Sequence, residues 1–254
     1  MSSNKLVLAF FCAALSVLAQ APDAKTLLAG AGKSLLGASS FRSEMQTSVD
    51  MQGAGMSNKI KMIMKTSGSN GKLRMEMTPM GMTMVSDGES VYLWLQPLNQ
   101  YMKKPAPSTP EGLADAFVPG AGNLSKDAMD AMTAKVVRQE AVDLGGQKVE
   151  CYVIDSTLDK MSLPQGMPVA LGISNVHQTS WIDKDRHFLL KQTSDMEMQM
   201  GGPGSAPTKI HSETTMTSLD LSPVFGPDEF KFTPPEGAKL VDSLPGMQNL
   251  KFGK

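Results

Sequence analysis

Apolar and polar side chains alternate along much of the chain. In residues 41–51 the apolar side chains all occupy odd-numbered positions, and charged, amide or hydroxyl side chains fill the even-numbered positions between them. The same alternation recurs in residues 60–64 and 73–77. Successive side chains of a strand point to opposite faces, so this period of two predicts strands with one buried face. Glycine-containing turns at 52–55 and 68–71 predict that these strands pair as antiparallel neighbours.

The remaining pattern predicts more strands and few helices. Residues 91–95 are apolar on both faces, which predicts a central position in the sheet. Residues 158–172 contain Pro and Gly and indicate an insertion between two strands. The other strands are expected at 82–85, 135–144, 148–155, 176–182, 188–200 and 209–219, with a short helix after Pro110 and another near 127–134.

One amphipathic helix is expected before the first strand. Asp23 suits its N-terminus, because a carboxylate there accepts a hydrogen bond from a free backbone N–H, and Gly37 suits its end. Leu27, Leu28 and Leu35 recur at the spacing of one helical face, so this helix should lie on an apolar surface. Many short strands with few helices predict a mainly β, α+β fold in which helices cap a curved antiparallel sheet.

The N-terminal residues have the layout of a secretion signal. Lys5 precedes an apolar run, 6–15, and small residues follow it. The run is shorter than the roughly 20 apolar residues that a membrane-spanning helix needs. It therefore predicts a cleaved signal peptide, residues 1–19, with cleavage after Ala21 as the alternative. We expect residues 20–254 to form a single soluble domain in the periplasm.

Composition and motifs exclude several classes of function. The net charge is -1, with both signs interspersed, which gives no sign of a nucleic-acid binder. Once the signal is removed only Cys151 remains, so no intramolecular disulfide is expected. Cys151 alternates with Val149 and Val153, which predicts a buried structural thiol. The chain has no nucleophile elbow, phosphate loop, zinc-protease motif or Cys-x-x-Cys, so we expect neither catalysis nor a cofactor.

Four segments carry further motifs, in order along nearly the whole mature chain. They are Ser40-Phe41, residues 85–100 (VSDGESVYLWLQPLNQ), residues 181–184 (WIDK) and residues 230–237 (FKFTPPEG). Together they resemble the motifs of the LolA-like periplasmic lipoprotein carriers. The resemblance implies an incomplete antiparallel β-barrel closed by helices, with an apolar cavity that receives acyl chains. That superfamily also includes outer-membrane acceptors, envelope regulators resembling RseB, and mycobacterial glycolipid carriers.

Methionine is frequent, with 21 residues, whereas aromatic residues make up only 6%. Thioether side chains adapt to irregular apolar partners, so a methionine face suits a variable acyl chain, although the same face also suits an ordinary core. With the resemblance, this leads to the hypothesis of a monomeric periplasmic carrier or binder of lipid or lipoprotein acyl chains, with an inner- or outer-membrane protein as a further candidate partner. The residues expected to line its cavity are Leu27, Leu28, Leu35, Met45, Val49, Met62, Met64, Met75, Met77, Met82, Met84, Leu93 and Trp94.

Two alternative functions remain open. Met-x-Met spacing on a strand places sulfur atoms on one side, and Cu(I) accepts thioether ligands. The candidate copper ligands form two alternative groups: Met75, Met77 and Met80 in one, and Met196, Met198 and Met200 in the other. His211 would join the second group if the strand register places it opposite. The other alternative is a sensing module, resembling RseB, that passes a lipid signal to a membrane partner.

Overall fold

The structure is a computed structural model that describes residues 22–35, 37–53, 56–109, 112, 126–161, 171–200 and 206–244. The signal peptide expected at 1–19 lies outside the described residues. The helices are α1 (Ala24–Ser34), the 3-10 turn η1 (Gln96–Leu98) and α3 (Lys126–Ala131). The strands are β1 (Ser40–Gly53), β2 (Met56–Ser69), β3 (Lys72–Thr78), β4 (Met82–Ser86), β5 (Ser90–Leu95), β6 (Gln100–Pro105), β7 (Thr133–Leu144), β8 (Gln147–Met161), β9 (Leu171–Asp183), β10 (Leu189–Met200), β11 (Thr208–Asp220) and β12 (Lys239–Leu240).

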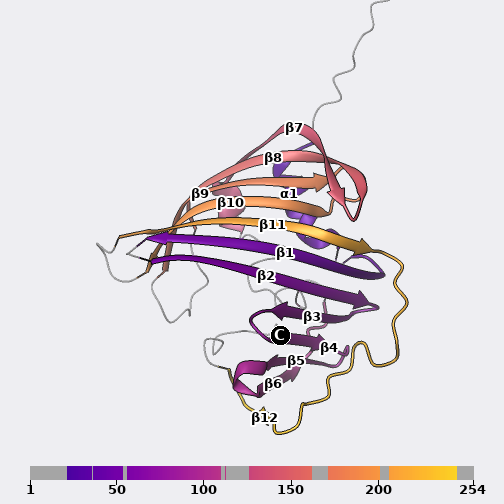
Figure 1. Cartoon of the computed structure of the whole chain (residues 1–254). Helices are drawn as coiled ribbons and strands as arrows, with labels where there is room; N and C mark the ends of the chain where they lie inside the picture. The colour runs from indigo at the N-terminus through magenta and orange to yellow at the C-terminus, as the bar shows by residue number, and fades with distance from the viewer. Residues whose placement is uncertain are drawn as a thin grey trace, which may run out of the picture.

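All of these strands belong to one 12-stranded sheet, in the order β12-β6-β5-β4-β3-β2-β1-β11-β10-β9-β8-β7. β1 to β6 form one meander and β7 to β11 a second, and the pairing of β1 with β11 joins the two (Figure 1). Neighbouring strands are antiparallel except for β12, which runs parallel to β6. The end strands β12 and β7 do not pair with each other, so the sheet is curved and open. The expected mainly β fold is confirmed.

Strand pairing follows the alternation in the sequence. Val49 of β1 pairs with Ile60 of β2, so the apolar positions of the two strands share one face. Both predicted hairpins, β1–β2 and β2–β3, are confirmed. At the second turn Asn70 and Gly71 have φ of 50° and 76°. A two-residue hairpin turn requires these left-handed conformations, which Asn and Gly adopt at low cost.

The helix α1 begins and packs as expected. The Asp23 carboxylate accepts the backbone N–H of Thr26 at 2.7 Å, which caps the first turn. Leu27 is buried and packs in a cluster with Ile154 of β8 and Ile182 of β9. The helix therefore covers the part of the sheet formed by the second meander, and it ends at Ser34, before the predicted Gly37.

The position of β5 differs from the prediction. Only β6 and β12 lie between β5 and one end of the sheet, so β5 is not central. Val91 and Leu93 are buried on one face, as predicted. On the other face the ring of Tyr92 stacks on Phe232 from the C-terminal segment, with centroids 5.1 Å apart. A distant segment thus supplies the cover that a neighbouring layer supplies to a central strand.

Other elements differ from the prediction, and one predicted helix is not described. β8 continues to Met161 and β9 begins at Leu171, so most of the predicted insertion at 158–172 belongs to strands or lies outside the described residues. The helix expected near 127–134 is α3, and β7 follows it directly. The short helix expected after Pro110 falls almost entirely outside the described residues. The edge strands β6 and β12 were not predicted, because Lys and Pro in β6 hide its alternation.

The C-terminal residues 221–244, which we call the C-terminal strap, run from the end of β11 across the first meander to its far edge (Figure 1). Phe225 lies 5.0 Å from the guanidinium of Arg42 on β1. Further along, Phe232 contacts Tyr92 and Tyr101 of β5 and β6. The strap then adds β12 beside β6.

Candidate functional site

One face of the sheet carries both α1 and the predicted methionine face. α1 packs on Ile154 of β8. Residues paired across antiparallel strands lie on the same face. The pairs that connect Ile154 to Met62 of β2 pass through Ser180, Gln192, Thr214 and Thr47. Met62 and Ile154 therefore share one face, which we call the helix face.

The strand residues predicted for the cavity wall lie on the helix face, with one exception. Those on this face are Met45, Val49, Met62, Met64, Met75, Met77, Met82, Met84 and Leu93. Trp94 follows Leu93 on β5 and pairs with Thr83 and Tyr101, so it lies on the opposite face. Placing Trp94 beside Leu93 in one wall was wrong, because adjacent strand residues point to opposite sides.

The three leucines predicted to line the cavity from the helix lie on or next to α1. Leu27 is buried against the sheet. Leu28 is partly buried and contacts both the α1 cluster and a cluster that contains Met132 and Leu158. Leu35 follows α1 and packs against two clusters of buried side chains, one that contains Met75 and one that contains Val153. These residues fix the helix to the sheet.

One half of the helix face is a filled core. Met75 and Met84 are each 2% exposed and Leu93 is 1% exposed. Side chains this inaccessible touch no space large enough for water. The buried cluster consists of Phe41, Leu73, Met75, Met82, Met84, Val91, Leu93, Met102 and Leu244. In this half the methionines fill a core, as the simpler interpretation of the sequence had it.

The other half of the helix face is only partly covered. A contiguous group of half-buried apolar side chains extends over β2, β1, β11 and β10, and we call it the apolar strip. Its members are Val49, Met51, Ile60, Met62, Met196 and Ile210. Met51 pairs with Ile210, and Ile210 pairs with Met196, so the strip is continuous across strands. Four strands at a spacing of roughly 4.8 Å make it about 14 Å wide.

The polar groups beside the apolar strip are mainly hydroxyls. Thr47 and Thr214 lie on the helix face next to Val49 and join through their Oγ1 atoms at 3.0 Å. Ser212 pairs with Val49 across the β1–β11 ladder. Hydroxyls that already bond to each other require no charged partner, so this surface accepts an apolar ligand without stranding a charge.

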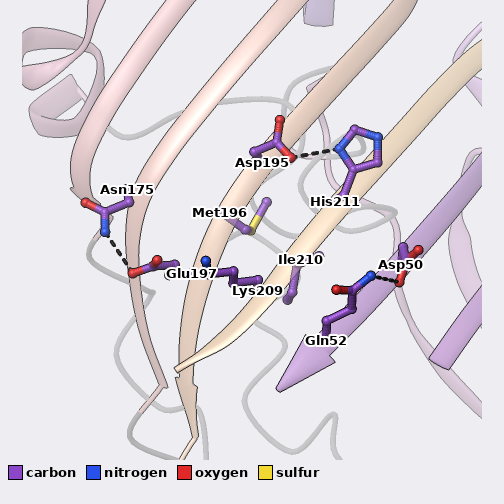
Figure 2. Close-up of a pocket in the computed structure, with 9 residues that line it drawn as sticks. All are labelled: Asp50, Gln52, Asn175, Asp195, Met196, Glu197, Lys209, Ile210 and His211. Atoms are coloured by element: carbon purple, nitrogen blue, oxygen red, sulfur yellow. Dashed lines mark hydrogen bonds and ion pairs between the residues drawn. The ribbon is translucent and has the colours of Figure 1, made fainter. Parts of the chain in front are cut away.

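A hollow of about 460 Å³ lies at the far ends of β1, β9, β10 and β11 (Figure 2). Its polar side chains occupy the positions that alternate with the apolar strip. His211 pairs with Asp50 on one side and with Asp195 on the other. Figure 2 shows the bond between the His211 Nδ1 and the Asp195 carboxylate, 2.8 Å long, and the bond from Asn175 to Glu197.

The charged side chains in and beside this hollow form ion pairs at the protein surface. The hydrogen bond to Asp195 raises the pKa of His211 above its usual value, and Glu213 adds to the effect. The Lys59 ammonium lowers the pKa of Asp50, to which it is bonded at 3.2 Å. All of these groups are solvent-accessible and charge-compensated. Most of the side chains that line the hollow are polar, with Met196 and Ile210 as the exceptions, so it is not the apolar cavity that was expected under the helices.

A second hollow, of about 370 Å³, lies between the C-terminal strap and the first three strands. Its charged residues form ion pairs, with Arg74 Nη2 at 2.7 Å from Glu76 and Arg42 Nη2 at 3.5 Å from Glu229 of the strap. Arg74 and Glu76 lie on the face opposite the helix face, because Met75 between them is on it. This hollow also lacks an apolar wall suited to an acyl chain.

The first group of copper ligands proposed from the sequence is divided between the core and the surface. Met75 is 2% exposed in the filled core while Met80, in the β3–β4 turn, is 50% exposed. In the second group, Met196 pairs with Ile210 and Met198 with Thr208, so these two methionines lie on one face of β10. His211 pairs with Asp195 and not with Met196, so the His–Met arrangement does not form. Within the described part of the chain, no three His, Cys, Asp or Glu side chains are placed to hold a metal ion.

Cys151 and Asp183 are both buried, in surroundings that suit a structural role. Cys151 is fully buried, and desolvation, with the charge of Asp183 second, raises its pKa to about 12. A thiol with that pKa is not a nucleophile near neutral pH. Asp183 is buried at the end of β9 and accepts hydrogen bonds from the backbone N–H of Asp185 and from Arg186 Nε. Asp183 therefore stabilises the turn that follows β9.

Sequence reasoning missed two residues of this region. Met102 on β6 joins the filled core, and its strand was not predicted. Leu244 is fully buried in the same core although it follows the last long strand. Alternation could have indicated Met102, which Tyr101 and Lys103 flank. Nothing near Leu244 in the sequence indicates what it contacts.

Comparisons with known proteins place the chain in a family. Residues 24–244 match the family described as "Predicted periplasmic protein (DUF2092)". A comparison with curated proteins finds no match. No helix in the described ranges is long and apolar enough to cross a membrane.

Solved structures with a similar arrangement have low identity. A LolA superfamily protein from Nitrosomonas europaea is 11% identical, with a TM-score of 0.32, and the match covers 82% of this chain and 97% of that one. A putative outer membrane lipoprotein-sorting protein domain from Vibrio parahaemolyticus is 14% identical, with a TM-score of 0.29, covering 82% and 96%. A DUF1329 family protein from Desulfovibrio piger is 13% identical, with a TM-score of 0.33, covering 82% and 95%. The family match alone, which spans the helix α1 and every strand, shows that the chain belongs to the DUF2092 family of predicted periplasmic proteins.

Proposed function

We propose that this protein binds lipid, or the acyl chains of a lipoprotein, in the periplasm, and that the apolar strip is where the chain lies. The observation that carries the proposal is the continuity of the strip: half-buried Met, Ile and Val side chains on four paired strands. A periplasmic family fits an extracytoplasmic lipid carrier. The proposal assigns a binding role and no reaction.

Physical chemistry favours an acyl chain over other apolar ligands. The strip is an elongated surface without a charged side chain, and Met51, Met62 and Met196 can adjust to a ligand of variable shape. Each buried methylene contributes about 0.8 kcal/mol. A chain shorter by four carbons therefore loses roughly 3 kcal/mol, which corresponds to more than a hundredfold in Kd. Affinity should rise steeply with chain length until the strip is covered.

A direct test is titration with cis-parinaric acid, a fluorescent fatty acid, using wild-type protein and two variants. Met62→Glu places a charge on the apolar strip. Lys61→Glu changes the adjacent residue of the same strand, which pairs with Ser48 on the opposite face. We expect saturable binding to the wild type, at least tenfold weaker binding to Met62→Glu, and an unchanged Kd for Lys61→Glu. Equal affinity of both variants would place the ligand elsewhere.

Native mass spectrometry of protein purified from the cell envelope identifies the natural ligand. The proposal expects an added mass that extraction with organic solvent removes and that contains an acyl chain. Recovery of only the unliganded mass, together with no saturation by cis-parinaric acid, would contradict the proposed function.

A carrier and a sensing module differ in their partners. A freely diffusing carrier would be a monomer that leaves its donor and acceptor after each transfer. A sensor would stay bound to a membrane protein. Crosslinking in intact envelopes followed by size analysis separates the two, because only the sensor gives a persistent complex that is present with and without lipid.

A further inference from the structure

The C-terminal strap passes around the open edge of the sheet. Phe232 lies against Tyr92 and Tyr101, on the face opposite the helix face, because Leu93 and Met102 occupy the alternate positions. At the edge, β12 adds its residues beside β6. Beyond β12, Leu244 is fully buried within the filled core on the helix face. The strap therefore brings one fully buried side chain, Leu244, into the methionine core, while its Leu221 and Val241 pack against the core from the margin.

Leu244 differs from the other buried members of that core. Each of the others belongs to a strand of the first meander: β1, β3, β4, β5 or β6. Their positions are fixed by the pairing of the strands. Leu244 alone within this cluster comes from a segment without regular structure, four residues after Leu240. It is the member that can leave without disturbing the ladder from β1 to β6.

The strap pairs with the edge over the two residues of β12, with a backbone hydrogen bond on either side of Leu240. Lys239 N–H donates to the Asn99 carbonyl at 3.0 Å and Val241 N–H donates to the Tyr101 carbonyl at 2.9 Å. Leu240, between them, is 60% exposed. An edge segment of this length opens at lower cost than the long strands of the sheet.

The filled core and the apolar strip are parts of one surface. Met64 and Met77 pack against the core from its margin. Met64 lies on β2 two residues beyond Met62 of the strip, on the same face. A chain lying on the strip and extending along this face meets the core, which is close-packed and cannot accept added volume. Entry requires one side chain to leave.

We propose that Leu244 occupies the inner end of the acyl-chain site, and that a bound acyl chain displaces Leu244 and releases β12 from β6. This inference rests on the proposed function and specifies how the site opens. A leucine side chain and a stretch of methylenes have the same apolar character, so one replaces the other within the core. The strap closes the core when no ligand is bound and yields its place when a chain arrives.

The first test is titration of Leu244→Ala with cis-parinaric acid, with Leu240→Ala as the matched control on the same strap. Leu244→Ala removes three carbon atoms from the space that the chain must enter, so we expect at least tenfold tighter binding than for the wild type. Leu240 is exposed, and its variant should bind as the wild type does. Circular dichroism and thermal unfolding establish that each variant is folded.

Hydrogen exchange of the wild-type protein tests the same displacement without a variant. Addition of cis-parinaric acid should speed exchange in residues 239–244, because the Lys239 and Val241 amides lose their bonds to Asn99 and Tyr101. Exchange in β3 and β4 should not speed up. This measurement decides the matter if Leu244→Ala does not fold.

The outcomes separate the two proposals. Wild-type binding with unchanged or weaker affinity in folded Leu244→Ala, or with unchanged or slower exchange in the strap, overturns the displacement and leaves the proposed function standing. No binding by any variant overturns both. Tighter binding by Leu244→Ala with faster exchange in the strap supports both.

Discussion

Replacing Gly68 with Ala tests how tightly the filled core is packed. Gly68 of β2 pairs with Phe41 of β1 on the helix face. A Cβ at Gly68 would lie 2.3 Å from Cε1 and 2.8 Å from Cζ of the Phe41 ring. That ring is 2% exposed, so it has no free space to turn into. Overpacking of a core costs about 1–3 kcal/mol, and so close a contact belongs in the upper half of that range. For a chain of this size, Gly68→Ala should lower Tm by about 4–10 °C.

The assay is urea and thermal unfolding of Gly68→Ala, Phe41→Leu and the double variant. Leucine lacks the ring atoms that the new methyl group meets, so the double variant should be more stable than the sum of the single changes by at least ~1 kcal/mol. Gly30→Ala in α1 is the control of opposite sign, because nothing lies within 4 Å of its added Cβ. Helix propensity predicts that it stabilises by about 0.5–1 kcal/mol. A Gly68→Ala protein as stable as the wild type, or strictly additive changes, would show that the core has room.

Three further predictions concern polar and reactive groups. The hydrogen bond to Asp195 raises the pKa of His211 in the folded protein. The stability that this bond adds is fully present below the unfolded pKa of about 6.5 and is lost as pH rises through the higher folded pKa. His211→Gln should therefore lose more stability at pH 5.5 than at pH 8.5. Cys151, with its pKa raised to about 12, should resist iodoacetamide at pH 8 until the protein is unfolded in urea, and rapid alkylation of folded protein would contradict its burial. Asp183→Ala should destabilise by roughly 1.5–3 kcal/mol in urea unfolding, because Arg186 and the turn amides lose a buried carboxylate; a change below about 0.5 kcal/mol would argue against that role.

Alternation along the strands was enough to predict which side chains share a face. Met75 and Leu93, far apart in the sequence, lie on the same side because each follows the period of two and both pair with Met84. The same rule separates Trp94 from Leu93, so the error with Trp94 was avoidable. Turn chemistry was equally local, since Asp183 bonds to residues within three positions of itself.

What covers each face could not be predicted from the sequence. Leu244 and Phe232 come from the C-terminal strap and pack on opposite faces of the first meander. Their contacts depend on the route of the strap around the edge, which no local pattern encodes. The same limit applies to the methionines. Met75 in the core and Met62 in the apolar strip have equivalent patterns in the sequence, yet one is sealed and the other half-exposed, because burial depends on segments distant in the chain.

In the proposed complex an acyl chain lies on the helix face, over the apolar strip. Photocrosslinking with a diazirine fatty acid, followed by mass spectrometric mapping of the modified residues, tests this most directly. We expect adducts at Met51, Met62 and Ile210 that an excess of unlabelled fatty acid suppresses. Adducts confined to the opposite face, for example at Lys61 or His211, or adducts that the competitor does not reduce, would contradict it.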